Sequence, residues 1–238
     1  MAVVCLQALS QMLVLLPNQR TNETKVLSNK ADRLAREINQ GISEYGVRTH
    51  PKYGNIYGYE VDGFGSVNFM DDANVPSLLS LPYLGYCKKN DSLYLATRKF
   101  VLSVANPYYS LIGFSSGSIK GGVGGPHIGT PYFFLSLFCF SFFSRSHFFL
   151  KKCSLKGRGW VWPMSLIVQG LTSQSDDEIK DLLQLLTTIS INTNGFIHES
   201  FWKDNYQSYT RPWFAWANSI FGEFVLTVAA ERPYLIFN

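Results

Sequence analysis

Apolar residues recur with a helical period along much of this sequence. In the segment 24–46 the apolar residues recur at intervals of mostly seven and four, which puts them on one face of a helix. The apolar stretch before Pro17 predicts a buried helix, and Asn22 or Thr24 can cap the helix that follows. Further helices are expected at 76–86, 92–104, 160–172, 176–191 (capped by Ser175) and 212–230.

Long loops separate these helices. Residues 52–74 and 113–127 are rich in glycine and show no sustained period, and the alternation typical of strands is nearly absent from the chain. We therefore predict an all-α fold, with residues 1–238 in a single domain. Loops of this length in a helical protein usually carry function.

Composition favours a deep, aromatic-lined pocket over a surface that wraps nucleic acid. Aromatic residues make up 15% of the chain and charged residues 16%, below the usual quarter. The formal net charge is +4, but the lysine and arginine residues are scattered and form no basic stripe. We therefore expect no nucleic-acid partner.

The cysteines and histidines predict neither a metal site nor a redox pair. The four cysteines show no CxxC spacing, and the four histidines follow no HExxH or other metal-binding pattern. We expect no metal and no cofactor. Two N-glycosylation patterns, at Asn22 and Asn90, favour the secretory pathway or an extracellular location.

Residues 130–158 differ in composition from the rest of the chain. Eight of the 18 phenylalanines lie between Phe133 and Phe149. The uncharged run 130–144 is shorter than the roughly 18–20 residues that a membrane span needs, so no span is expected. Runs of Phe, Ser and Leu are typical of a translated, pyrimidine-rich intron tail. We interpret the segment as an insertion that comes from a retained intron or a gene-model error.

Three polar residues, Asp71, Asp72 and Asn74, precede Pro76 at an expected helix start. Helix capping explains one of them, because acidic side chains favour helix N-termini. Two adjacent acids and an amide in a long loop also suit the binding of neighbouring sugar hydroxyls. His127 ends a glycine-rich run and is either structural or a neutral hydrogen-bond donor to a ligand.

Arg211 precedes two tryptophans, Trp213 and Trp216, on adjacent turns of an expected helix. Core packing explains such tryptophans, above all Trp216. Sugar rings also stack their apolar C–H faces on indoles, and an arginine beside an aromatic ring can orient a substrate oxygen or carboxylate. Both interpretations remain open for this motif.

Glu199 is the strongest catalytic candidate. It lies between a histidine and a serine in GFIHESFW, close to Phe196, Phe201 and Trp202. Apolar surroundings favour the protonated form of a carboxyl group, and a general acid uses that proton to release a glycosidic oxygen. The alternative is a structural ion pair with Arg211 or another cation.

Several of these motifs, in this order, resemble glycoside hydrolase family 125. They are YEVDGFG, MDDANVPSLLSLPYLGY, RKFVLSVANPYY, GGPHIG, WVWPMSLIVQGLTS, GFIHESF and TRPWFAWANSIFGE. The resemblance covers residues 1–129 and 159–232. It implies an (α/α)6 barrel and a metal-independent, exo-acting hydrolase that removes terminal α-1,6-linked mannose with inversion. The implied substrate is an α-mannoside oligosaccharide, such as an N-glycan or a mannan.

The resemblance also implies roles for the candidate residues. Inversion uses one carboxylic acid to protonate the leaving group and one carboxylate to activate water, roughly 6.5–9.5 Å apart. Glu199 occupies the general-acid position in this comparison. The other candidates fall on motifs that resemble the sugar-binding wall: Asp71, Asp72, Asn74, His127, Arg211 and Trp213.

The chain departs from the family pattern at its start. In the family the general base lies on an Arg-Pro-Ser-Asp-Asp segment before the helix that residues 1–16 match, and this sequence has no such segment. We therefore expect a partial domain, the C-terminal part of a barrel, without hydrolytic activity of its own. The alternatives are a non-catalytic homologue that binds mannosides, a truncated chain that misfolds, and a membrane-associated interaction protein that uses the phenylalanine run.

Overall fold

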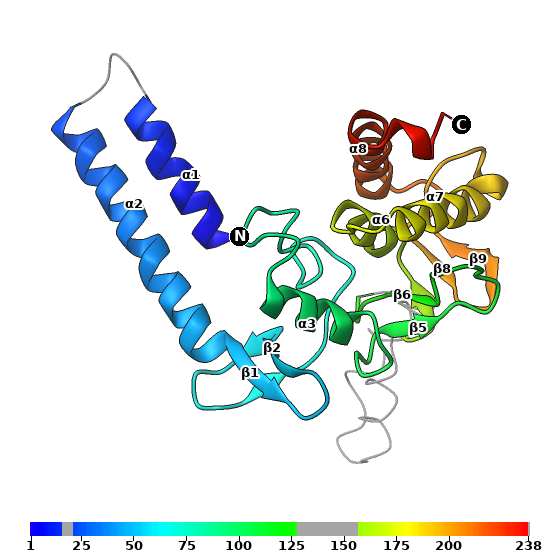
Figure 1. The fold of residues 1–238 in the computed structure, drawn as a ribbon, viewed down its shortest axis with the longest axis horizontal. Coiled ribbons are helices and arrows are strands. Elements are labelled where there is room, and N and C mark those ends of the chain that lie inside the picture. Colours follow the sequence, from blue (N-terminus) through cyan, green and yellow to red (C-terminus); the bar gives the residue numbers. More distant parts are fainter. Residues whose placement is uncertain (16–20, 128–156, 238) are drawn as a thin grey trace, which may run out of the picture.

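The computed structural model of the chain describes residues 1–15, 21–127 and 157–237 (Figure 1). Within these ranges the α-helices are α1 (Ala2–Leu15), α2 (Asn22–Gly41), α3 (Ser92–Val101), α6 (Pro163–Leu171), α7 (Asp176–Ser190) and α8 (Ala215–Glu231). Three shorter helical segments follow α2, α7 and α8: η1 (Ile42–Gly46), η2 (Ile191–Thr193) and η3 (Pro233–Leu235).

Helices α1 and α2 form an antiparallel pair that extends away from the rest of the fold (Figure 1). The N-cap of α2 is Thr21, whose hydroxyl oxygen accepts a hydrogen bond from Thr24 N at 3.2 Å, and not Asn22 or Thr24 as expected. The expectation of a buried first helix is also wrong. Val3 is the buried residue of α1, because α2 covers one side of the helix and leaves the other side open.

The buried face of α2 is lined by small residues and not by the apolar stripe that its periodicity suggests. Leu27 and Leu34 of that stripe are 47% and 42% exposed. The buried residues are Ser28, Ala31 and Ala35. Ser28 Oγ lies 3.0 Å from Ser10 Oγ of α1, so these small side chains let the two helices approach closely.

Two short hairpins connect this helix pair to α3. Strand β1 (Val47–His50) pairs antiparallel with β2 (Gly54–Tyr57), and β3 (Glu60–Val61) pairs antiparallel with β4 (Val67–Asn68). The backbone N–H of Tyr57 donates to Thr97 Oγ1 of α3 at 3.0 Å. This bond fixes the first hairpin to the helix that follows it in the chain.

A second group of strands carries the residues of interest. Strand β5 (Tyr109–Leu111) pairs antiparallel with β6 (Gly121–Val123). Strands β7 (Trp160–Val161), β8 (Ser200–Trp202) and β9 (Asn205–Thr210) form a three-stranded antiparallel sheet in the order β7-β8-β9. Trp162 N donates to Val123 O at 3.1 Å, which joins β6 to the strand beside it.

These strands overturn the prediction of an all-α fold and, with it, the expected (α/α)6 barrel. The described residues form a mixed structure in which helices and antiparallel sheets alternate. The predicted helix at 76–86 is a series of turns instead. Most of the strands span two to four residues, and so short a stretch shows no alternation that sequence analysis could detect.

Helix α6 packs against α7 and α8 and also contacts β6, and these three helices supply much of the buried apolar core (Figure 1). Every residue of α6 is buried. A Cβ on Gly170 would lie 2.5 Å from Phe224 Cζ, so α6 and α8 can approach this closely because residue 170 has no side chain. Ser175 caps α7 by accepting from Glu178 N, as the sequence predicts.

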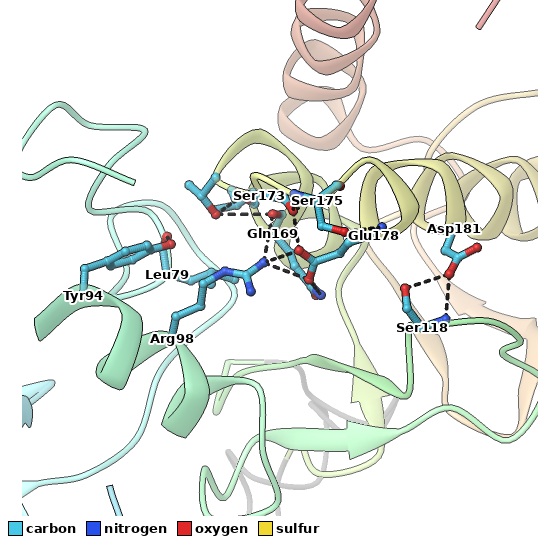
Figure 2. A network of polar contacts seen from close by, with 11 residues as sticks. Leu79, Tyr94, Arg98, Ser118, Gln169, Ser173, Ser175, Glu178 and Asp181 are labelled. Carbon is cyan, nitrogen blue, oxygen red and sulfur yellow. Dashed lines mark hydrogen bonds and ion pairs between the residues drawn. The ribbon is translucent and has the colours of Figure 1, made fainter. Parts of the chain in front are cut away.

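A half-buried polar network links α3 to α6 and α7 (Figure 2). Arg98 Nη2 lies 2.8 Å from both carboxylate oxygens of Glu178, and Gln169 Nε2 donates to Glu178 Oε1 at 2.7 Å. Ser173 Oγ donates to the other oxygen, Oε2. Burial acts to raise the pKa of Glu178, but Arg98, Ser173 and Gln169 together outweigh it and lower that pKa.

The Phe-rich segment at 130–158 lies almost entirely outside the described residues, so its interpretation as an insertion stays a prediction. Within the described residues, no helix combines the length and the apolar character that crossing a membrane requires.

Candidate functional site

Glu199 lies at the entry to strand β8. The chain reaches it through a turn in which Asn194 and Gly195 both have positive φ, 54° and 83°. The backbone N–H of Glu199 then donates to the carbonyls of Thr210 and Arg211, both at 3.2 Å. The β8–β9 pairing therefore places Glu199 directly opposite Arg211.

The two side chains form an ion pair. Arg211 Nη1 lies 3.2 Å from Glu199 Oε1, and Thr210 Oγ1 donates to Glu199 Oε2 at 3.0 Å. The Glu199 side chain is 14% exposed, whereas that of Arg211 is 67% exposed. The ion pair considered as an alternative for Glu199 is therefore present, and both carboxylate oxygens have a donor.

The apolar shell expected around Glu199 is incomplete. Phe201 is fully buried, but Phe196 is 51% exposed. The neighbouring His198 is fully buried and stacks on Tyr209, with ring centroids 5.0 Å apart. Burial lowers the pKa of His198 to about 4, so its ring is neutral at physiological pH.

A second cluster forms around Asp72. Its Oδ2 lies 3.0 Å from His127 Nε2, and its Oδ1 accepts from the backbone and side-chain nitrogens of Asn74 at 3.0 and 3.2 Å. Asp72 is 2% exposed, while the His127 side chain is 65% exposed. The buried carboxylate therefore holds an exposed imidazole in place.

Asp71 points elsewhere. Its carboxylate accepts hydrogen bonds from the backbone nitrogens of Leu78 and Leu79 at 2.8 and 3.0 Å, which fixes the turns after it. Burial raises the pKa of Asp71 to about 7, against the lowering effect of these two donors. In this arrangement the contacts of Asp71 are those of a structural anchor.

The tryptophans after Arg211 lie on the surface. Trp213 is 58% exposed and Trp216 is 63% exposed, so core packing is not the explanation for Trp216 in the described structure. Phe214 lies between them in the chain, 5.7 Å from the Trp216 ring and 5.8 Å from the Arg211 guanidinium. Arg211 therefore sits at the edge of an exposed aromatic group.

The backbone connects the two clusters although no hydrogen bond or ion pair joins them directly within the described ranges. Ala73 N donates to Gly124 O at 2.9 Å, beside the end of β6. Strand β6 adjoins β7 through Trp162, and β7 pairs with β8. The segments of Asp72 and His127 thus connect to β6, and Glu199 leads into β8, within one run of hydrogen-bonded strands.

Two further residues, Thr210 and Asn218, contact the Glu199 segment and were not predicted from the sequence. Thr210 bonds the Glu199 carboxylate, and Ser200 Oγ lies 2.6 Å from Thr210 Oγ1. Asn218 binds the backbone before Glu199 with its side-chain amide. Thr210 and Asn218 both belong to the motif TRPWFAWANSIFGE, but a single sequence gives no signal that singles them out. Among the described residues, no group of three or more His, Cys, Asp or Glu side chains could hold a metal ion.

Residues 1–147 and 142–226 match the sequence profile of a family described as metal-independent alpha-mannosidase, GH125. The chain is 45% identical over 203 residues to the meiotically up-regulated gene 157 protein of Schizosaccharomyces pombe. That match covers 85% of this chain and 33% of the yeast protein.

The structure also resembles a solved metal-independent α-mannosidase of Streptococcus pneumoniae, which was captured in a non-productive complex with α-1,6-mannobiose. The TM-score is 0.76 at 35% sequence identity, and the match covers 97% of this chain and 46% of the bacterial one. This chain therefore spans a third of the fungal relative and less than half of the bacterial enzyme.

Proposed function

Because this chain belongs to the GH125 family of metal-independent α-mannosidases, we propose that it forms part of a site that removes terminal α-1,6-linked mannose with inversion. The substrate is an α-mannoside oligosaccharide such as an N-glycan or a mannan. The complex of the S. pneumoniae relative with α-1,6-mannobiose supports this linkage.

The observation that carries the proposal is the geometry of Glu199. Its carboxylate is largely shielded from solvent and faces the exposed guanidinium of Arg211, and Glu199 directly precedes strand β8, which pairs with β9. A shielded carboxylate beside an exposed cation gives a sugar both a reacting group and a binding group. Arg211 is the member of the pair that a substrate can reach first.

Glu199 has two possible roles. As a general acid, the role that the resemblance implies, it protonates the departing glycosidic oxygen. Arg211 and Thr210 both contact the Glu199 carboxylate, so this role requires Arg211 to turn from Glu199 towards the substrate. In a second candidate role, Glu199 activates the attacking water as general base, and the same two contacts orient its carboxylate.

The second cluster supplies sugar-binding groups in this proposal. His127 is held by Asp72 and exposes its ring, so it can contact a sugar hydroxyl. Asn74 lies on the same carboxylate, and the exposed Trp213 offers an indole face for stacking. Asp71, which precedes Asp72 in the chain, fixes the turns at 78–79 through its hydrogen bonds.

We further propose that the 238-residue chain binds mannosides without hydrolysing them. An inverting site needs two carboxyl groups in different roles, and the sequence lacks the segment on which the family carries the general base. The alternative is that the chain is a non-catalytic homologue and not a part of an active mannosidase. This alternative also predicts that the chain binds mannosides.

Titration with three mannobioses, linked α-1,6, α-1,3 and α-1,2, tests the substrate, while proton NMR follows the release of free mannose. The proposal predicts that the α-1,6-linked disaccharide binds most tightly and stays intact during the experiment. Equal affinity for all three would contradict the linkage. Release of β-mannose would contradict the lack of hydrolysis while supporting inversion.

A further inference from the structure

Glu199 directly precedes strand β8 and Arg211 directly follows strand β9. The pairing of these two strands therefore fixes the chain after Glu199 to the chain before Arg211. The backbone N–H of Glu199 bonds the carbonyls of Thr210 and Arg211 across this ladder. Beyond it, the chain before Glu199 comes from the turn at Gly195, and the chain after Arg211 leads into α8. The ladder alone does not set the spacing of these two outer segments.

Asn218, in the first turn of α8, contacts both outer segments with its side-chain amide. Asn218 Oδ1 accepts from Ile197 N at 3.0 Å. Asn218 Nδ2 donates to Ile197 O at 2.7 Å and to Phe214 O at 2.8 Å. The backbone N–H of Phe214 also donates to Ile197 O, at 3.1 Å. One side chain thus ties the residue two positions before Glu199 to the residue three positions after Arg211.

The chemistry of this contact requires an amide. It uses one acceptor and both N–H donors of the side chain, and aspartate, which has nearly the same shape, offers no donor when ionised. An ionised aspartate would also place its charge against the carbonyls of Ile197 and Phe214. Alanine would leave the N–H of the fully buried Ile197 without a partner.

From this geometry we propose that Asn218 is a positioning residue for the Glu199–Arg211 pair. The inference rests on the proposed function of that pair in mannoside binding. Both N–H groups of Asn218 are donated to the backbone, so the residue acts through Arg211 and Glu199 and not on the sugar itself. Loss of the Asn218 hydrogen bonds should shift the position of the Glu199–Arg211 ion pair relative to a bound mannoside.

The test compares the wild-type chain with Asn218→Asp and Asn218→Ala, and uses Ser219→Ala as the matched control. Ser219 is the next residue of α8 and is exposed. Urea unfolding reports stability, and calorimetric titration reports the affinity for α-1,6-mannobiose. A displacement of about 1 Å can cost on the order of 100-fold in a site, so we expect affinity losses of at least about tenfold in both Asn218 variants. Ser219→Ala should bind as the wild type does.

A double variant separates positioning from general destabilisation. If Asn218 acts through Arg211, Asn218→Asp should cost much less affinity in an Arg211→Ala background than in the wild type. Equal losses in both backgrounds, or wild-type affinity in the folded Asn218→Asp variant, would overturn the inference. Should Asn218→Ala fail to fold, the isosteric aspartate variant still decides. Absence of binding by the wild type would instead overturn the proposed function, and the inference with it.

Discussion

Arg211 places its Nη1 atom 3.2 Å from Glu199 Oε1 while its own backbone lies in the left-handed region, at φ 41°. This conformation costs a non-glycine residue on the order of 1–3 kcal/mol, so the surrounding structure has to stabilise it. The Glu199 N–H bond to Arg211 O and the nearby Phe214 ring are two such contacts. Backbone strain of this kind is concentrated at functional sites, which fits the proposed role of the pair.

Substrates with different leaving groups distinguish the two roles of Glu199. A general acid assists a poor leaving group, whereas fluoride departs from α-mannosyl fluoride without protonation. With azide supplied as an external nucleophile, the general-acid role predicts that Glu199→Gln slows the reaction of an aryl α-mannoside by about 10²–10⁴-fold and leaves that of the fluoride unchanged. If the wild type hydrolyses the fluoride without azide and Glu199→Gln does not, Glu199 is the general base.

Substitution of Gly125 tests the Asp72 cluster. A Cβ at this position would lie 2.5 Å from Asp72 Oδ1, so Gly125→Ala should displace the carboxylate from His127 and weaken mannobiose binding. Gly222→Ala is the control, because a Cβ there meets nothing within 4 Å and alanine should stabilise α8 by about 0.5–1 kcal/mol. Calorimetric titration of both variants provides the comparison. Unchanged affinity in a folded Gly125→Ala variant would remove this cluster from the proposed sugar site.

The contact between Arg98 and Glu178 should be important for stability (Figure 2). Both side chains are less than a fifth exposed, and Arg98→Met would leave the Glu178 carboxylate without its cation. We expect the free energy of unfolding to fall by about 3 kcal/mol, because removing one partner of a buried ion pair leaves the other charge buried and uncompensated. The exposed pair of Arg33 and Glu37 serves as the control, where Arg33→Met should cost less than about 1 kcal/mol. If urea unfolding showed similar losses of unfolding free energy for Arg98→Met and Arg33→Met, burial would not explain the contribution of the Arg98–Glu178 pair.

His198 should make stability depend on pH. Its folded-state pKa is about 4, below the ordinary value of 6.5. Between these two values the unfolded chain binds a proton that the folded chain does not. The free energy of unfolding should therefore decrease as the pH falls from about 6.5 to 4, with His198 contributing on the order of 3 kcal/mol.

Urea unfolding of the wild type and of His198→Phe across this pH range isolates the contribution of His198. Phenylalanine keeps an aromatic ring next to Tyr209 but cannot bind a proton. Titrating groups that both proteins share cancel when one curve is subtracted from the other. The free energy of unfolding of the wild type, relative to that of His198→Phe, should therefore decrease as the pH falls from about 6.5 to 4. Curves of equal slope would show that His198 is not buried in its neutral form.

The extent to which the fold could be predicted follows from the length of each element. Helix α7 is long, periodic and capped by Ser175, so both its position and its cap are confirmed. Strands β7 and β8 are two and three residues long, and their pairing joins Trp160 to Trp202 across the sequence. No local pattern encodes such a contact, and the all-α prediction failed for this reason.

The candidate site was predictable only where a local motif marks it. The GFIHESFW motif drew attention to Glu199, and its ion pair with Arg211 was one of two interpretations of that residue. The role of Asn218 depends on three hydrogen bonds to backbone atoms of distant residues. These bonds exist only once α8 packs beside the Glu199 segment, so the residue types alone do not reveal them.

Calorimetric titration of α-1,6-mannobiose into the wild-type chain and into Arg211→Ala is a direct test of a mannoside site at the Glu199–Arg211 pair. Arg211 is exposed and joins the ligand to Glu199 in this account, so the wild type should bind the disaccharide and Arg211→Ala should bind it at least about tenfold more weakly. No binding by the wild type, or the same affinity in a folded Arg211→Ala variant, would contradict a mannoside site at the Glu199–Arg211 pair.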